Sequence, residues 1–156
     1  MKKKGIAKAR PRRKPSPRPR RQATPIEALR LSVRMVEAAV PYAEVSIQQT
    51  VTEDSMERLF EHARAELLRH QPRRVLVDLR DAKVTLSISD LNGLVKLIAA
   101  SFAGMVERLG IVLRPADLPL EKFFEPSMSN RGLPTYVTQD YDDAIGWLTT
   151  RLLPRR

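Results

Sequence analysis

The feature that most constrains the fold is a short apolar run, Val75-Leu76-Val77-Asp78-Leu79, between two amphipathic helical patterns. A run of this kind, placed after two arginines, is typical of a central strand that is covered on both faces. The helical pattern before it starts at a Thr52 cap and ends near His70, ahead of Pro72. Alternation of strands with amphipathic helices predicts an α/β fold in which neighbouring strands are parallel.

The alternation continues to the C-terminus. A second helix is predicted from a Ser89 cap to a stop at Gly110, because a wide apolar stripe runs through this segment. The remaining predicted elements are a buried strand at 111–113, a short helix opening at Asp117, a strand at 133–138, and a last helix capped by Asp140 that reaches Leu152.

The start of the folded region fits two patterns. Apolar residues alternate strictly with polar ones from 29 to 35, as in a half-buried strand, but Ile26, Leu29 and Val33 also have helical spacing. The segment 44–51 alternates too, and the Pro41 between them suits a hairpin loop. We favour the hairpin and keep a leading helix over 28–37 as the alternative. The hairpin would place one polar row outward, formed by Arg30, Ser32, Arg34, Ser46, Gln48 and Thr50.

Together these elements predict a single α/β domain over residues 26–156, with a mixed central sheet of about five strands and about four helices. The opening hairpin supplies the antiparallel member, and three strand–helix–strand crossovers make the other neighbours parallel. A domain of about 130 residues can bury well over half of the surface that its unfolded chain exposes.

Residues 1–25 are a separate basic segment. They hold eleven of the 28 lysines and arginines and no acidic residue, which leaves 17 basic and 18 acidic residues in 26–156. Five prolines and the lack of aromatic residues predict a disordered tail, because such a segment buries too little apolar area to fold. The expected polyanion-binding residues are Lys2, Lys3, Lys4, Lys8, Arg10, Arg12, Arg13, Lys14, Arg18, Arg20 and Arg21.

Nucleic acid or the ribosome is the first candidate polyanion for this tail. Its cations could neutralise up to about ten phosphates, with a steep and sequence-independent salt dependence. No aromatic residue is interleaved for base stacking, so the tail should not read bases. An anionic membrane surface is the second candidate, and a purely solubilising extension is the remaining interpretation.

Composition excludes several classes of protein. The chain has no Cys, which rules out disulfides, thiol nucleophiles and zinc–thiolate sites and fits a reducing cytoplasm. No run is long and apolar enough to span a bilayer, and the basic N-terminus lacks the apolar core of a secretory signal. Phosphate-cradling glycine loops and Gly-x-Ser-x-Gly elbows are also missing. We therefore expect a cytoplasmic protein without cofactor, metal site or catalytic residues.

The best constellation of polar residues follows the predicted central strand. Asp78 and Asp81 flank its carboxyl end, where open α/β sheets place ligands, and Asp90 could approach them. A magnesium or phosphoacceptor site would use such carboxylates, but pairing with Arg or capping of the loop also explains them, and we favour that interpretation. Arg131, in the polar loop 127–132, is a further candidate contact for a ligand or partner.

Three segments resemble a known family. The strand at 75–79 that continues as Arg80-Asp81, the Phe123-Phe124-Glu125 helix, and the closing Ala144-x-x-Trp147-Leu148 after an acidic cap look like the STAS-like proteins, which share the fold of the anti-sigma-factor antagonists. The resemblance covers most of residues 30–150. It implies a small non-catalytic α/β domain that binds partners, sometimes lipids or nucleotides.

The chain departs from that family at its phosphorylation site. Typical antagonists carry Asp-Ser-Ser-Gly-Leu at a helix start, where a partner kinase phosphorylates the first Ser. The corresponding stretch here is Asp90-Leu91-Asn92-Gly93-Leu94, so the switch does not carry over. Ser87 or Ser89 could replace that Ser from the preceding loop, although a helix cap is the simpler role for Ser89.

The leading functional hypothesis is a regulatory or adaptor domain that binds a protein partner and is tethered to a polyanion by its tail. A second copy of the chain is another candidate partner. The alternative is a carrier of lipids or small molecules with an apolar cleft near Phe123, Phe124 and Trp147. An enzyme comes third and would require a metal ion at Asp78, Asp81 and Asp90.

Overall fold

The computed structural model describes residues 29–150, together with Gly5, Pro11 and Arg12. The rest of the predicted tail and the expected reach of the last helix to Leu152 lie outside these residues. In chain order the elements are β1 (Leu31–Val36), β2 (Tyr42–Ile47), α1 (Glu53–His70), β3 (Arg74–Leu79), α2 (Ile88–Phe102), β4 (Arg108–Leu113), the 3₁₀ helix η1 (Pro115–Leu120), α3 (Glu121–Ser129), β5 (Thr135–Thr138) and α4 (Tyr141–Thr149).

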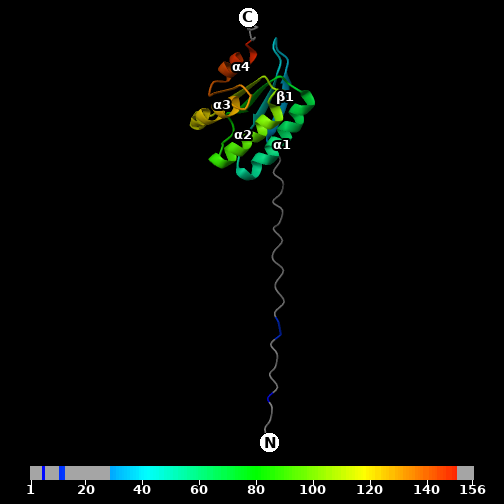
Figure 1. Cartoon of the computed structure of the whole chain (residues 1–156), viewed down its shortest axis with the longest axis vertical. Helices are drawn as coiled ribbons and strands as arrows, with labels where there is room; N and C mark the ends of the chain where they lie inside the picture. Colours follow the sequence, from blue (N-terminus) through cyan, green and yellow to red (C-terminus); the bar gives the residue numbers. More distant parts are fainter. Residues whose placement is uncertain (1–4, 6–10, 13–28, 151–156) are drawn as a thin grey trace.

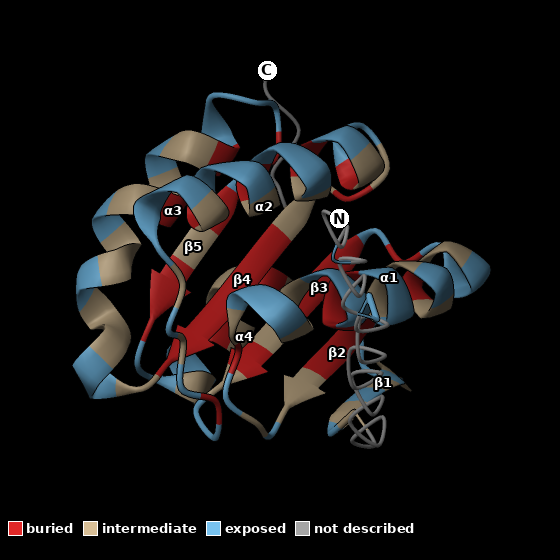
Figure 2. Cartoon of the chain, turned by 90° about the horizontal axis from the view of Figure 1, so that it is seen from below, coloured by how far each residue is buried: buried red, intermediate tan, exposed pale blue. Residues whose placement is uncertain are grey.

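The helices pack around a central sheet (Figure 1). The five strands form this one mixed sheet in the order β1-β2-β3-β4-β5 (Figure 2). β1 and β2 are antiparallel, and each later neighbour is parallel. This confirms the predicted α/β class with five strands and four α-helices, and it decides the choice at 28–37 in favour of the hairpin. Ser32 lies opposite Ser46 and Arg34 opposite Glu44, so the polar row forms on one face as expected.

Helices cover the two faces of the sheet unequally (Figure 2). α1, α2 and α3 pack on one face, where Phe60, Val95 and Met128 join strand residues such as Val45 in the main apolar core. α4 covers the other face through Ala144 and Leu148, which pack on Tyr42, Leu76 and Val112. None of the described helices is both long and apolar enough to cross a bilayer.

Reciprocal side-chain bonds fix the starts of the two long helices. The Thr52 hydroxyl accepts from the Ser55 amide at 3.2 Å, and the Ser55 hydroxyl accepts from the Thr52 amide at 3.0 Å. At α2 the same arrangement joins Ser87 to Asp90. The prediction of a Ser89 cap was therefore wrong by two residues. Ser89 is an exposed residue of the first helical turn, and Asp90 provides the reciprocal bond to Ser87.

The end of α2 also differs from the prediction. The helix stops at Phe102, and Gly104 with φ of +85° turns the chain towards β4. Met105, Val106 and Leu109 continue the helical spacing by coincidence, because Leu109 already belongs to the strand. Gly110 lies inside β4, where an added Cβ would come within 3.1 Å of Leu76 Cδ1 and 3.9 Å of the Ala144 carbonyl oxygen. Its role is to allow α4 to approach the sheet closely.

Two strands and one helix also differ from the prediction in their bounds or type. The strand predicted over 44–51 spans Tyr42–Ile47, and Val51 forms an isolated bridge with Val84 instead. The strand predicted over 133–138 begins only at Thr135. The short helix expected at Asp117 is a 3₁₀ turn that leads into α3.

Candidate functional site

Asp78, the first predicted site residue, lies at the end of β3 with its carboxylate bound by Arg80. The Arg80 side chain donates from Nη2 at 2.8 Å and from Nε at 3.0 Å, and the Arg80 amide donates at 3.1 Å. Burial raises the pKa of Asp78, but the hydrogen bonds and charge of Arg80 lower it more, so the net pKa lies below its ordinary value. This geometry suits Arg pairing, because three donors already occupy the carboxylate.

The other predicted site residues are dispersed. Asp81 is exposed beside the end of β3, whereas Asp90 is engaged with Ser87, whose hydrogen bonds lower the pKa of Asp90. Arg131 is exposed in the loop ahead of β5, near the amino ends of the parallel strands. Asp78 and Asp81 lie at the carboxyl end of β3, which is the opposite end of the strands. Within residues 29–150, no group of three His, Asp or Glu is arranged to hold a metal ion.

A charged network that the sequence did not predict connects α4 with the hairpin. Glu44 of β2 is 7% exposed, and its Oε1 accepts from Nη2 of Arg34 at 3.1 Å. The Tyr141 hydroxyl donates to Oε2 of the same carboxylate at 2.5 Å. Arg80 in turn lies 4.3 Å from the centroid of the Tyr141 ring. Each polar side chain of this network has a partner, so it serves to attach α4 to the sheet.

The pKa of Tyr141 reflects this setting. Burial raises it most, and the hydrogen bond to Glu44 raises it further, because ionising Tyr141 would place two negative charges side by side. The Tyr141 phenol therefore remains a hydrogen-bond donor throughout the neutral range. The raised pKa disfavours a role as a general base at neutral pH for this hydroxyl.

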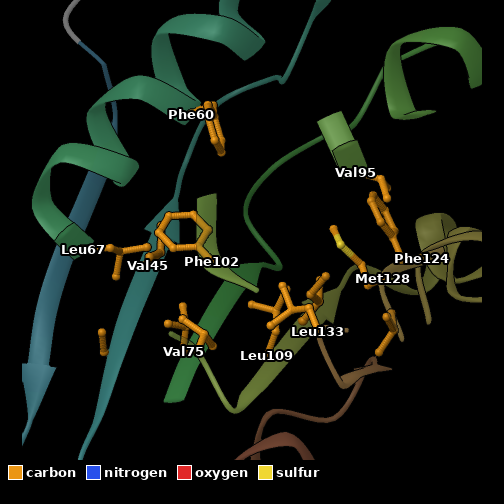
Figure 3. Packing of buried hydrophobic residues seen from close by; sticks show 14 of the residues in the cluster. Val45, Phe60, Leu67, Val75, Val95, Phe102, Leu109, Phe124, Met128 and Leu133 are labelled. Carbon is orange, nitrogen blue, oxygen red and sulfur yellow. The ribbon is translucent and has the colours of Figure 1, made fainter. Parts of the chain in front are cut away.

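One hollow in the described part of the chain is entirely apolar. A cavity of about 140 Å³ lies between α1, α2 and the sheet, and every lining side chain is aliphatic, aromatic or Met. Phe60 of α1 and Phe102 of α2 meet edge to face across it, with ring centroids 6.4 Å apart (Figure 3). Empty apolar cavities of about 150 Å³ stay dry and bind small apolar molecules.

This cavity exists because α1 and α2 cover the central strand β3 incompletely. On β3, Leu76 and Asp78 are buried by the neighbours on the α4 face, but Val77, which points towards α1 and α2, is only partly buried. Leu94 and Ile98 of α2 line the same hollow and are also only partly buried. α1 and α2 thus leave a gap above the centre of the sheet.

The apolar cleft expected near the last two helices does not form. Phe123 and Phe124 contact each other with centroids 5.7 Å apart and belong to the core beneath α1, α2 and α3. Trp147 packs on the opposite face, with the residues under α4. The sheet separates these aromatic residues, and sequence periodicity cannot show on which face of a sheet a helix will pack.

Comparison with known proteins identifies the fold. An uncharacterised protein of the DUF3478 family from Shewanella loihica PV-4, with a SpoIIAA-like fold, is similar in structure, with a TM-score of 0.55 and 13% sequence identity. The match covers 78% of this chain and 95% of that one. The chain has the SpoIIAA-like fold. The resemblance to STAS-like proteins is thereby confirmed for the architecture. No family model matches the sequence, and no curated protein matches it.

Proposed function

We propose that this protein is a non-catalytic binding domain whose ligand is a small apolar molecule held between α1, α2 and the sheet. The observation that carries the proposal is the partial exposure of Val77 at the floor of an entirely apolar cavity of about 140 Å³. A central strand that is incompletely covered loses packing contacts, and an apolar ligand would restore them. This develops the carrier alternative and moves its site from the last two helices to the first two.

Titration with benzene and with n-hexane, followed by methyl NMR of the full chain, tests this function. We expect saturable shifts at the methyl groups of Val77, Leu94 and Ile98, because these side chains line the cavity. Native mass spectrometry of the freshly purified protein would reveal a co-purifying apolar ligand. Shifts scattered over the surface, with no change at these three residues, would contradict the proposal.

Two substitutions on one helix provide a matched pair. Ala63 lines the cavity, whereas Ala65 is exposed on the opposite side of α1. Ala63→Met should fill the cavity, abolish the response to benzene and raise the melting temperature, and Ala65→Met should leave binding unchanged. If Ala63→Met does not fold, Ile98→Phe fills the same space from α2. Equal binding by both alanine variants would disprove the assignment.

A regulatory or adaptor function with a protein partner remains a second candidate, favoured by the outer face of the hairpin. This face bears Ser32, Arg34 and Ser46 beside α4, and the Arg34 side chain is 65% exposed. The continuous described stretch begins at Leu29, next to β1, so the basic segment 1–25 would be attached at this side of the domain. A partner bound on the hairpin would lie close to a polyanion bound by the tail.

Deletion of residues 1–25 tests the tethering part of this second function. Binding of the full chain to duplex DNA and to ribosomal RNA should weaken steeply as salt is raised, and the truncated chain should not bind. Equal retention of nucleic acid by both chains would disprove tethering. Arg34→Ala, which keeps the tail, should leave nucleic-acid binding unchanged and weaken only capture of a protein partner.

A further inference from the structure

A polar depression of about 890 Å³ lies where β2, β3 and β4 end. The segments after these strands line it, together with the first turn of α1 and with Arg30 just before β1. Its volume is in the range of small-molecule sites, about 300–1,000 Å³. Ala82, which is fully buried, lies at its base in a small apolar cluster with Val51, and Val51 lines the apolar cavity on the other side. The depression and the cavity are therefore separate.

Positive charge predominates in this depression. The lining includes four cationic side chains, those of Arg30, Arg80, Lys83 and Arg114, and one carboxylate, that of Asp81. Arg80 and Lys83 lie in the loop after β3, Arg114 follows β4 and Arg30 precedes β1, so their convergence is a product of the fold. Among the described residues, Arg30 and Lys83 form no salt bridge.

The paired cations keep donors available for a ligand. Arg114 is held by Asp117 through Nε at 2.9 Å, and neither of its Nη atoms donates to another residue within the described part of the chain. A guanidinium has five N–H donors, so this pairing positions Arg114 and leaves its outer edge free for an anion. Arg80 uses Nε and Nη2 on Asp78 and is also fixed in place.

Neutral polar side chains complete the lining. The hydroxyls of Thr50, Thr52 and Ser55 lie along the rim, beside the start of the 18-residue helix α1. The amide groups of a first helical turn carry a partial positive charge that favours anions. The Thr52 and Ser55 amides already donate within the α1 cap, so the donors left for a ligand are the cationic side chains. Convergent guanidinium and ammonium groups are the recognition chemistry of a phosphate group, which presents several strong acceptor oxygens.

We propose that this depression binds the phosphate group of a ligand, contacted by Arg30, Lys83 and Arg114. The phosphate could belong to a soluble metabolite or to a lipid headgroup, since both present the same oxygens. The site is independent of the apolar ligand proposed above, because a different set of residues forms it.

Titration of the full chain with inorganic phosphate and with pyrophosphate, followed by amide NMR, tests the site. We expect saturable shifts at the amides of Thr52, Ser55 and Lys83, with pyrophosphate binding more tightly. The double variant Arg30→Gln/Lys83→Gln should bind at least about tenfold more weakly, equivalent to about 1.4 kcal/mol. Both substituted side chains are exposed, so the dispersion of the amide spectrum should be unchanged.

Lys96→Gln is the matched control, because Lys96 is an exposed cation of α2 outside the depression. It should bind phosphate as the wild type does. Shifts that are absent from these three amides in the wild type, or equal affinity in the double variant, would overturn the proposal. Vesicles of phosphatidylcholine with phosphatidic acid distinguish the source: weaker vesicle binding by the double variant indicates a lipid headgroup, and phosphate binding without that difference indicates a soluble ligand.

Discussion

Tyr141 of α4 donates its hydroxyl to Oε2 of Glu44 on β2, 97 residues earlier in the chain. The remaining oxygen of this buried carboxylate accepts from Arg34 on β1. A buried carboxylate without partners would be strongly destabilising, so these two hydrogen bonds allow the Glu44 side chain to be buried beneath α4. Because α4 covers its face of the sheet without another described helix beside it, the bond also fixes where the helix lies.

Removal of the Tyr141 hydroxyl should destabilise the domain. Tyr141→Phe keeps the ring against Arg80 but leaves Oε2 of Glu44 without its donor, and we expect a loss of about 1–2 kcal/mol in the free energy of unfolding. Urea denaturation measures this loss. Tyr136→Phe is the control, because Tyr136 donates to the carboxylate of Asp143 at an exposed position and should cost less than about 0.5 kcal/mol. Equal losses would contradict this account of Glu44.

The Asp78–Arg80 pair should make stability depend on pH in the acid range. Because the folded state lowers the pKa of Asp78, its contribution is complete above the unfolded pKa of about 4 and is lost as the pH falls through the lower folded value. Asp78→Asn should cost about 1–2 kcal/mol at pH 7, a moderate value because the Arg80 side chain is 46% exposed. The difference from wild type should shrink below about pH 4. A difference in unfolding free energy that is the same at pH 7 and pH 3 would refute this.

Two glycines should respond oppositely to substitution. Gly110→Val places methyl groups against Leu76 and α4 in a fully buried layer, and we expect a loss of about 1–3 kcal/mol. Gly93 lies on the exposed side of α2 with open space around its Cβ position, so Gly93→Ala should gain about 0.4–1 kcal/mol. Thermal unfolding of the two variants checks both signs. A stable Gly110→Val protein would mean that α4 does not approach β4 closely.

The cap of α2 can be located by two serine substitutions. Ser87→Ala removes the acceptor for the Asp90 amide and should cost about 1 kcal/mol. Ser89→Ala, at an exposed position in the first turn, should change stability by less than about 0.5 kcal/mol. Urea denaturation of both variants distinguishes them, and the reverse order would restore Ser89 as the cap.

Local patterns were sufficient for the elements and their order. Alternation over 29–35 predicted a strand that the structure confirms, and the Thr52 and Asp140 caps lie where the sequence placed them. Periodicity failed where two elements shared one spacing by chance, so that residues up to Leu109 were assigned to α2. The fold then determined the rest, because Gly110 is required by a close approach of α4 and not by a helix end.

The candidate sites depended on contacts that periodicity does not encode. The sequence shows Glu44 only as the first residue of an alternating segment, and the position of Tyr141 shows that it is buried. The apolar cavity results from the gap between α1 and α2, although each helix has the apolar stripe of an ordinary core helix. Arg30 and Arg114 are 84 positions apart in the sequence, but both line the polar depression because the sheet brings the start of β1 and the end of β4 to the same end of the strands.

The strand order has a consequence for how the protein is made. Because the strands lie side by side in chain order, each one that leaves the ribosome finds its neighbour already synthesised, and the sheet can grow from one edge. The face that holds Leu76 and Val112 remains uncovered until α4 emerges, and α4 is the last described element. A nascent chain stalled before Tyr141 would therefore expose an apolar sheet surface, which is the situation in which chaperones bind and aggregation begins.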